Sequence, residues 1–79
     1  MQHPMKFASQ AELYQFSEMA SKESYPIHIT TNAVMLDARS ILALMTLIGK
    51  DVLIVAPDHV NANTFGKFLQ RYEKHRVSA

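Results

Sequence analysis

The sequence predicts an α+β fold, in which three helices cover one face of a small antiparallel sheet of three or four strands. Two kinds of pattern predict it. In some segments apolar residues recur with the spacing of a helix face, and in others they alternate or form short runs. The segments follow the order helix, hairpin, helix, strand, helix, which is typical of helices layered on an antiparallel sheet. The 79 residues make one domain, 1–79, since no linker or internal repeat divides them.

The N-terminal segment, residues 1–8, is expected to be short or irregular. Met1 to Pro4 is predicted to be a flexible start, and Met5 to Phe7 has room for only a very short strand. A fourth strand is therefore optional. Without it, a strand at Val52 to Ala56 would have an exposed edge, and such an edge invites pairing with a second copy of the chain.

The first helix is predicted to cover residues 9–22. Ser9 and Glu12 form the pattern Ser-x-x-Glu, in which a hydroxyl and a carboxylate cap the free N–H groups of a helix start. The apolar spacing then predicts which side chains face the core. They are Leu13, Phe16 and Ala20.

A hairpin is predicted over residues 25–36. Its first strand alternates apolar and polar residues, which indicates a half-buried strand, and Pro26 moves the start of that strand toward an edge or an end. Thr31 and Asn32 supply a turn before a return strand at 33–36. The apolar positions of the first strand are Tyr25, Ile27 and Ile29.

The second half of the chain is predicted to hold a helix at 39–48, a strand at 52–56 and a helix at 60–74. The helix at 39–48 is apolar on more than one face, so some of its side chains should be exposed. Gly49 suits its C-terminal end, and the strand after it is expected to be buried and central. The last helix is amphipathic through Phe65, Phe68, Leu69 and Tyr72.

The segment from Ala38 to Leu44, with the sequence Ala-Arg-Ser-Ile-Leu-Ala-Leu, resembles a motif of the HPr family. These are the histidine-containing phosphocarrier proteins of the sugar phosphotransferase system, and their motif is Ala-Lys-Ser-Ile/Leu-Met-x-Leu. The order of elements over residues 9–75 is also similar. The resemblance implies an HPr-like open-faced sandwich for the whole domain.

In some members of that family the serine of the motif is a regulatory phosphorylation site, and the residues around it contact partner proteins. The resemblance therefore implies Ser40 as the candidate phosphorylation site. It implies a partner-binding surface at Arg39, Ile41, Leu42 and Met45. The residues alone leave two other interpretations open, because serine is a common helix cap and the apolar side chains are equally suited to filling a core.

The family's phosphoryl-accepting histidine stands in Gly-x-His-x-Arg-Pro before the first helix, and Ser9 occupies the matching position. Gln10, Ala11 and Glu12 follow, so the arginine and the proline are also missing. No basic group is expected there to stabilise a phosphoryl charge, and a serine phosphate ester is too stable for transfer. The connection from Ile48 to Asp51 is also shorter than the family's usual one.

The four histidines are scattered and show no metal-ligand spacing, so no metal site is predicted. Two of them, His3 and His59, are candidates for an unorthodox phosphoryl acceptor if the fold brings either near the first helix. The others are His28 and His75. No nucleophile, base and orienting group are recognisable as a set, and no phosphate-binding glycine loop is present, so neither catalysis nor a cofactor is predicted.

The sequence therefore favours an HPr-like protein that acts as a regulatory or protein-binding module without orthodox phosphohistidine transfer. The alternatives are a phosphocarrier with an unorthodox histidine and a domain that shares only the fold and serves in oligomerisation or ligand binding. Expected partners are phosphotransferase-system or regulatory proteins, with a homo-oligomer as a further possibility. A net charge of +1 gives no support for nucleic-acid binding. The absence of cysteine fits a cytoplasmic location, and the apolar run at 41–48 is too short to enter a membrane.

Overall fold

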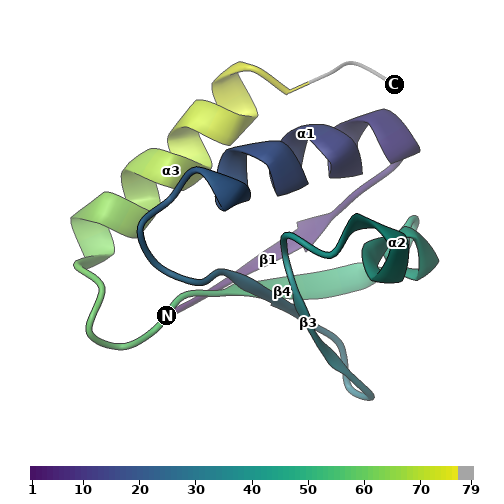
Figure 1. The fold of residues 1–79 in the computed structure, drawn as a ribbon, viewed down its shortest axis with the longest axis horizontal. Coiled ribbons are helices and arrows are strands. Elements are labelled where there is room, and N and C mark those ends of the chain that lie inside the picture. Colours follow the sequence, from purple (N-terminus) through teal and green to yellow (C-terminus); the bar gives the residue numbers. More distant parts are fainter. Residues whose placement is uncertain (77–79) are drawn as a thin grey trace.

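The structure is a computed structural model and describes residues 1–76. It confirms the predicted α+β fold, with helices packed against one face of a four-stranded antiparallel sheet of order β1-β4-β2-β3 (Figure 1). Helices α1 and α3 lie side by side over the sheet, and α2 packs against α1. The elements are β1 (Gln2–Lys6), α1 (Gln10–Ser21), β2 (His28–Thr30), β3 (Met35–Asp37), α2 (Ile41–Leu44), η1 (Met45–Leu47), β4 (Asp51–Val55) and α3 (Ala62–Lys74).

The N-terminal segment corrects the prediction of an irregular start, because β1 spans Gln2–Lys6 and pairs with β4 along its whole length. The N–H of Ala56 donates to the carbonyl of Met1, so every second residue from Met1 presents its backbone to β4. Pro4 therefore faces the outer edge of the sheet, where the missing N–H costs no ladder bond. With β1 in place, β4 is internal, and the expected exposed edge beside it does not exist.

The hairpin and the second helix are both shorter than predicted. Strands β2 and β3 have three residues each, and the expected helix at 39–48 consists of the four-residue α2 followed by the 3₁₀ turn η1. Leu44 and Leu47 are both buried, and a 3₁₀ turn places residues three apart on one line. The core thus favours the tighter turn, which the sequence pattern did not distinguish from continued α-helix.

Strand β4 is central, as predicted, but it is not buried on both faces. Val52 and Ile54 point into the core, whereas Leu53 and Val55 lie on the opposite, open face and are half-buried. The strand begins after Gly49, whose φ of 81° lies in the left-handed region that glycine adopts at the end of a helix. The Gly49 N–H donates to the Phe7 carbonyl at 2.8 Å, which joins this turn to the end of β1.

The core centres on four aromatic rings from three parts of the chain. Phe16 of α1 makes edge-to-face contacts with the other three, at centroid distances of 5.1, 5.5 and 5.1 Å. The predicted inward residues Leu13 and Ala20 are buried beside it. This cluster fixes α3 across α1 and sets where the C-terminal end of α3 lies. The partners of Phe16 are Phe7, Phe68 and Tyr72.

The helices are all short. Among residues 1–76, none combines the length and the apolar composition that crossing a bilayer requires.

Candidate functional site

The first candidate site is the start of α1, where the predicted capping box forms. Ser9 is the N-cap, and its Oγ accepts a hydrogen bond from the Glu12 N–H at 3.3 Å. The Glu12 carboxylate reaches back and accepts from the Ala8 N–H at 3.2 Å through Oε2. The Ser9 hydroxyl lies 3.5 Å from the same oxygen. Side chains of the protein thus accept from the Glu12 N–H at this helix end and from the Ala8 N–H just before it.

Glu12 is a buried carboxylate, with 2% of its surface exposed, and Arg76 neutralises it. Arg76 Nε lies 2.5 Å from Glu12 Oε1, and Arg76 Nη2 also donates to the Lys6 carbonyl at 3.1 Å. The hydrogen bond to Glu12 raises the pKa of Arg76 above its ordinary value. A charge-assisted pair at a buried carboxylate holds the end of α3 against the start of α1.

Tyr72 contacts both members of this pair. Its hydroxyl donates to the Glu12 carbonyl at 3.4 Å, and the Arg76 guanidinium lies 6.0 Å from the centre of its ring. Burial raises the pKa of Tyr72 to about 12, so the phenol stays protonated at neutral pH. The sequence predicted no basic group at the start of this helix, and that prediction is wrong. Arg76 is there, but its charge is engaged by Glu12.

The second candidate site is the segment around Ser40. Arg39 folds back on Asp37 with two hydrogen bonds, Nε to Oδ1 at 3.1 Å and Nη2 to Oδ2 at 2.8 Å. The turn is completed by the Ser40 N–H, which donates to the Asp37 carbonyl at 3.0 Å. Ser40 is exposed at the N-cap of α2, and its side chain makes no capping hydrogen bond. Its hydroxyl is therefore accessible without disturbing the fold.

The apolar residues of this segment divide between core and surface. Leu42 is 82% exposed, the largest exposure among the large apolar side chains of residues 1–76. Ile41 and Met45 are half-buried and pack against the core. Of the predicted partner-binding residues, Leu42 and Arg39 are exposed, with the Arg39 guanidinium paired to Asp37, whereas Ile41 and Met45 also pack against the core.

The Asp37–Arg39 pair predicts a pH-dependent contribution to stability. The side-chain hydrogen bonds from Arg39 lower the pKa of Asp37 to about 2, and His28, its register partner on β2, adds a smaller effect. A lowered folded-state pKa stabilises above the ordinary pKa and loses that effect as the pH falls through the folded value. Arg39→Gln should therefore lower the urea midpoint at pH 7, and the difference from the parent should shrink from about pH 4 downward.

The measurement is a urea unfolding series between pH 7 and pH 2.5 on the parent and Arg39→Gln. Lys67→Gln, an exposed change on α3, is the matched control and should show no such trend. A difference between the parent and Arg39→Gln that is constant over this range would contradict the assignment.

The two histidines with a potential acceptor role lie away from the start of α1. His3 is in the first half of β1, three residues before Lys6, which is about 10 Å along a strand. His59 is in the loop before α3, and Figure 1 shows that loop and the start of α1 at opposite ends of the molecule. The amino group of Met1 lies 3.7 Å from Asp58 in the same loop. The fold thus brings neither histidine to Ser9.

Comparison with known proteins supports the fold. No family model matches the chain, and no curated protein matches it in sequence. Among solved structures it is similar to HPr-C-His from Thermoanaerobacter tengcongensis, with a TM-score of 0.67 over 94% of this chain and 92% of that chain. The chain has the fold of an HPr protein. The two sequences are 20% identical, so the likeness is one of fold.

The HPr fold brings the two candidate sites to one end of the molecule. Helix α2 packs against α1 at the end where α1 begins, as Figure 1 shows. In the sequence Ser9 and Ser40 belong to separate elements, and no local pattern relates them. Arg76 could not be predicted as part of this site, because it lies 64 positions from Glu12 in the sequence.

Proposed function

We propose that the protein is an HPr-like component of the phosphotransferase system that binds a partner protein and accepts no phosphoryl group at the start of α1. The carrying observation is the Glu12–Arg76 pair beside Ser9. A helix start favours an anion, and here an internal carboxylate already takes that place. Ser9 offers a hydroxyl where transfer requires an imidazole. A new phosphoryl group would meet a buried negative charge and a guanidinium that is already paired.

The test is incubation with the phosphoenolpyruvate-dependent donor enzyme, followed by mass spectrometry under conditions that preserve phosphohistidine. The parent should gain no acid-labile phosphoryl group, while a phosphorylatable HPr in a parallel reaction is fully labelled. The triple variant Ser9→His, Ala11→Arg, Glu12→Pro restores the His-x-Arg-Pro part of the family motif at the matching positions. It should gain acid-labile label to a stoichiometry at least tenfold above the parent.

The two proteins separate the possible outcomes. Stoichiometric acid-labile label on the parent would overturn the proposal, and peptide mapping would then identify the acceptor. A folded triple variant that stays unlabelled would contradict the step that assigns the loss of transfer to these three residues.

The binding surface proposed is the Ser40 segment, with Ser40 as a site of regulatory phosphorylation. The accessible hydroxyl, the neighbouring Arg39 and the exposed side chain of Leu42 support this assignment. A phosphate at Ser40 adds about two negative charges next to an apolar contact, which disfavours a partner that buries Leu42. The partner is proposed to be another phosphotransferase-system or regulatory protein of the cytoplasm.

Ser40→Asp and Leu42→Glu should each weaken partner binding without unfolding the protein. Both positions are exposed, so each change should alter the free energy of unfolding by no more than about 0.5 kcal/mol. Binding is measured by calorimetry with purified phosphotransferase-system proteins, and an affinity loss of about tenfold is expected. Met35→Glu, at a residue that is 62% exposed on β3, is the matched control and should bind like the parent.

The three variants separate the switch from the surface. Unchanged binding by a folded Ser40→Asp variant would contradict the proposal that Ser40 regulates binding. Unchanged binding by Leu42→Glu would contradict the proposal that the partner binds at Leu42. An equal loss of affinity with Met35→Glu would indicate that the interface includes strand β3.

A further inference from the structure

The open face of the sheet contains a notch that belongs to neither site described above. Strand β4 pairs with β1 along all five of its residues, but its pairing with β2 ends at Leu53, opposite Thr30. Beyond Thr30 the chain enters the turn of the β2–β3 hairpin, where the Thr31 N–H donates to the Val34 carbonyl across the hairpin at 2.9 Å. The first two residues of β4 are therefore left without a neighbour on this side.

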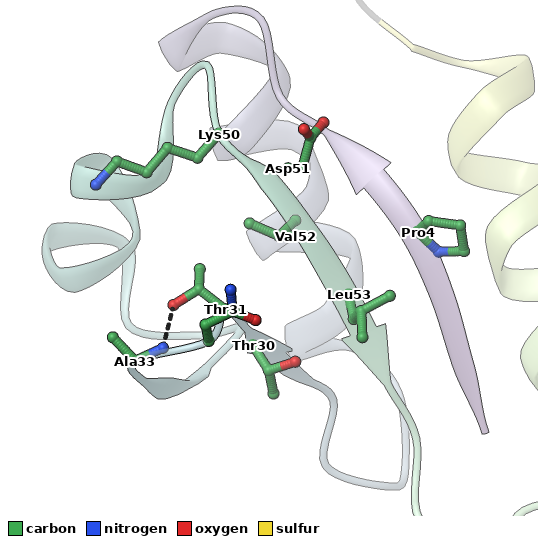
Figure 2. A pocket seen from close by; sticks show the side chains of 9 residues that line it. Pro4, Thr30, Thr31, Ala33, Lys50, Asp51, Val52 and Leu53 are labelled. Atoms are coloured by element: carbon green, nitrogen blue, oxygen red, sulfur yellow. Dashed lines mark hydrogen bonds between the residues drawn. The ribbon is translucent and has the colours of Figure 1, made fainter.

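This gap is a cavity of about 470 Å³ (Figure 2). Volumes of this order are typical of sites that hold small organic ligands. One wall is the hairpin tip, the other is the start of β4, and the cavity extends across the open face to β1. Its lining residues are Pro4, Thr30, Thr31, Asn32, Ala33, Lys50, Asp51, Val52 and Leu53.

The backbone of Asp51 faces this notch. Residues two apart in an antiparallel strand present their N–H and C=O groups to the same neighbour. The Ala56 N–H donates to the Met1 carbonyl of the β1 side, so the backbone N–H and C=O groups of Val52 and Ile54 are also directed at β1. Asp51 has the opposite parity and faces the β2 side, where no strand residue pairs with it. An N–H at this position is a hydrogen-bond donor directed into the cavity.

Two charged residues, Lys50 and Asp51, line this end of the cavity, and Lys6 lies beside Asp51, so that the three together carry one net positive charge. Lys50 is exposed and makes no ion pair among residues 1–76, whereas the Asp51 carboxylate lies 3.9 Å from Lys6. Thr31 adds a hydroxyl, whose oxygen accepts from the Ala33 N–H at 3.2 Å and from the Val34 N–H at 3.3 Å. With both lone pairs used, its proton is free to be donated to a ligand. Three residues that line this end of the cavity thus carry groups that can donate a hydrogen bond, namely the Lys50 ammonium, the Thr31 hydroxyl and the Asp51 N–H.

The other end of the cavity is apolar. Leu53 of β4 and Pro4 of β1 lie side by side on the open face, in register with each other, and both line the cavity. A ligand that satisfies both ends carries an anionic head and an apolar body. We propose that this notch binds small organic carboxylates, with the carboxylate at Lys50 and the Asp51 N–H and with the apolar body on Leu53 and Pro4.

The test is a titration followed through the backbone amide chemical shifts of the isotopically labelled protein. The probes are phenylacetate, its neutral amide phenylacetamide, and acetate, which lacks the apolar body. Phenylacetate should shift the amides of residues 30–33 and 50–53 in a saturable way. The other two should bind at least fivefold more weakly, because each lacks one of the two features that the notch recognises.

Lys50→Gln should weaken phenylacetate binding at least fivefold, while Lys67→Gln on α3 serves as the matched control and should bind like the parent. Shifts that do not saturate, equal affinity for the amide, or an equal effect of the two variants would overturn the proposal. Equal affinity for acetate would reduce the site to a general anion site and would also overturn it. Since no phosphoryl donor is involved, the outcome is independent of the proposed function.

Discussion

Phe16→Ala is expected to lower the free energy of unfolding by about 4 kcal/mol, more than any other single substitution proposed for this protein. Phe16 is completely buried and contacts three other aromatic rings. Its removal leaves a cavity that the remaining rings, which are anchored on two other segments of the chain, cannot close. A chain of this length has a total stability of about 4–12 kcal/mol, so the variant should be close to unfolding at room temperature.

Urea denaturation followed by circular dichroism measures this loss. Phe16→Leu refills part of the cavity, so it should lose less stability than Phe16→Ala and stay within the measurable range. Tyr14→Ala, on the same helix at a residue that is 48% exposed, is the matched control and should change stability by about 0.5 kcal/mol or less. A loss below about 2 kcal/mol for Phe16→Ala would show that the aromatic cluster is not the centre of the core.

The outer helices could be predicted from the sequence because their signals are local. The Ser9–Glu12 pair marks the start of α1, and the apolar spacing of α3 runs over two turns, from Phe65 to Tyr72. Strand β1 could not be predicted in the same way. A strand of this length that contains Pro4 has no distinctive local pattern, and its pairing with β4 joins residues about fifty positions apart. The break of the second helix into α2 and η1 likewise follows from core packing and not from propensity.

In the candidate sites, too, the features set by local sequence could be predicted and those set by long-range packing could not. The exposure of Ser40 and Leu42 could be predicted, because one helix face cannot bury every apolar residue of this segment. The state of the start of α1 could not. Its local sequence lacks a basic residue, and only the packing of α3 across α1 brings Arg76 to Glu12. The sequence therefore predicted that the transfer motif is missing, but it did not predict that Glu12 and Arg76 form an ion pair at the helix start.

Arg76→Ala is expected to lower the free energy of unfolding by about 3 kcal/mol. Removing one member of a pair is costly when the other is a buried charge, and Glu12 is almost inaccessible to water. The variant also loses the hydrogen bond to the Lys6 carbonyl and the contact with the Tyr72 ring. Arg71→Ala on the same helix is the matched control. Arg71 pairs with Glu23 at 3.2 Å, but it is half exposed, so this loss should be about 1 kcal/mol or less.

Glu12→Gln distinguishes the charge of the carboxylate from its capping role. The amide oxygen still accepts from the Ala8 N–H, and Arg76 reaches solvent, so the expected loss is about 1 kcal/mol. In the double variant with Arg76→Ala no buried charge remains, and stability should recover by about 1–2 kcal/mol relative to Arg76→Ala alone. Simple addition of the two losses would contradict this. The start of α1 would then not depend on the charge pair, and this pair could not be what excludes a phosphoryl group.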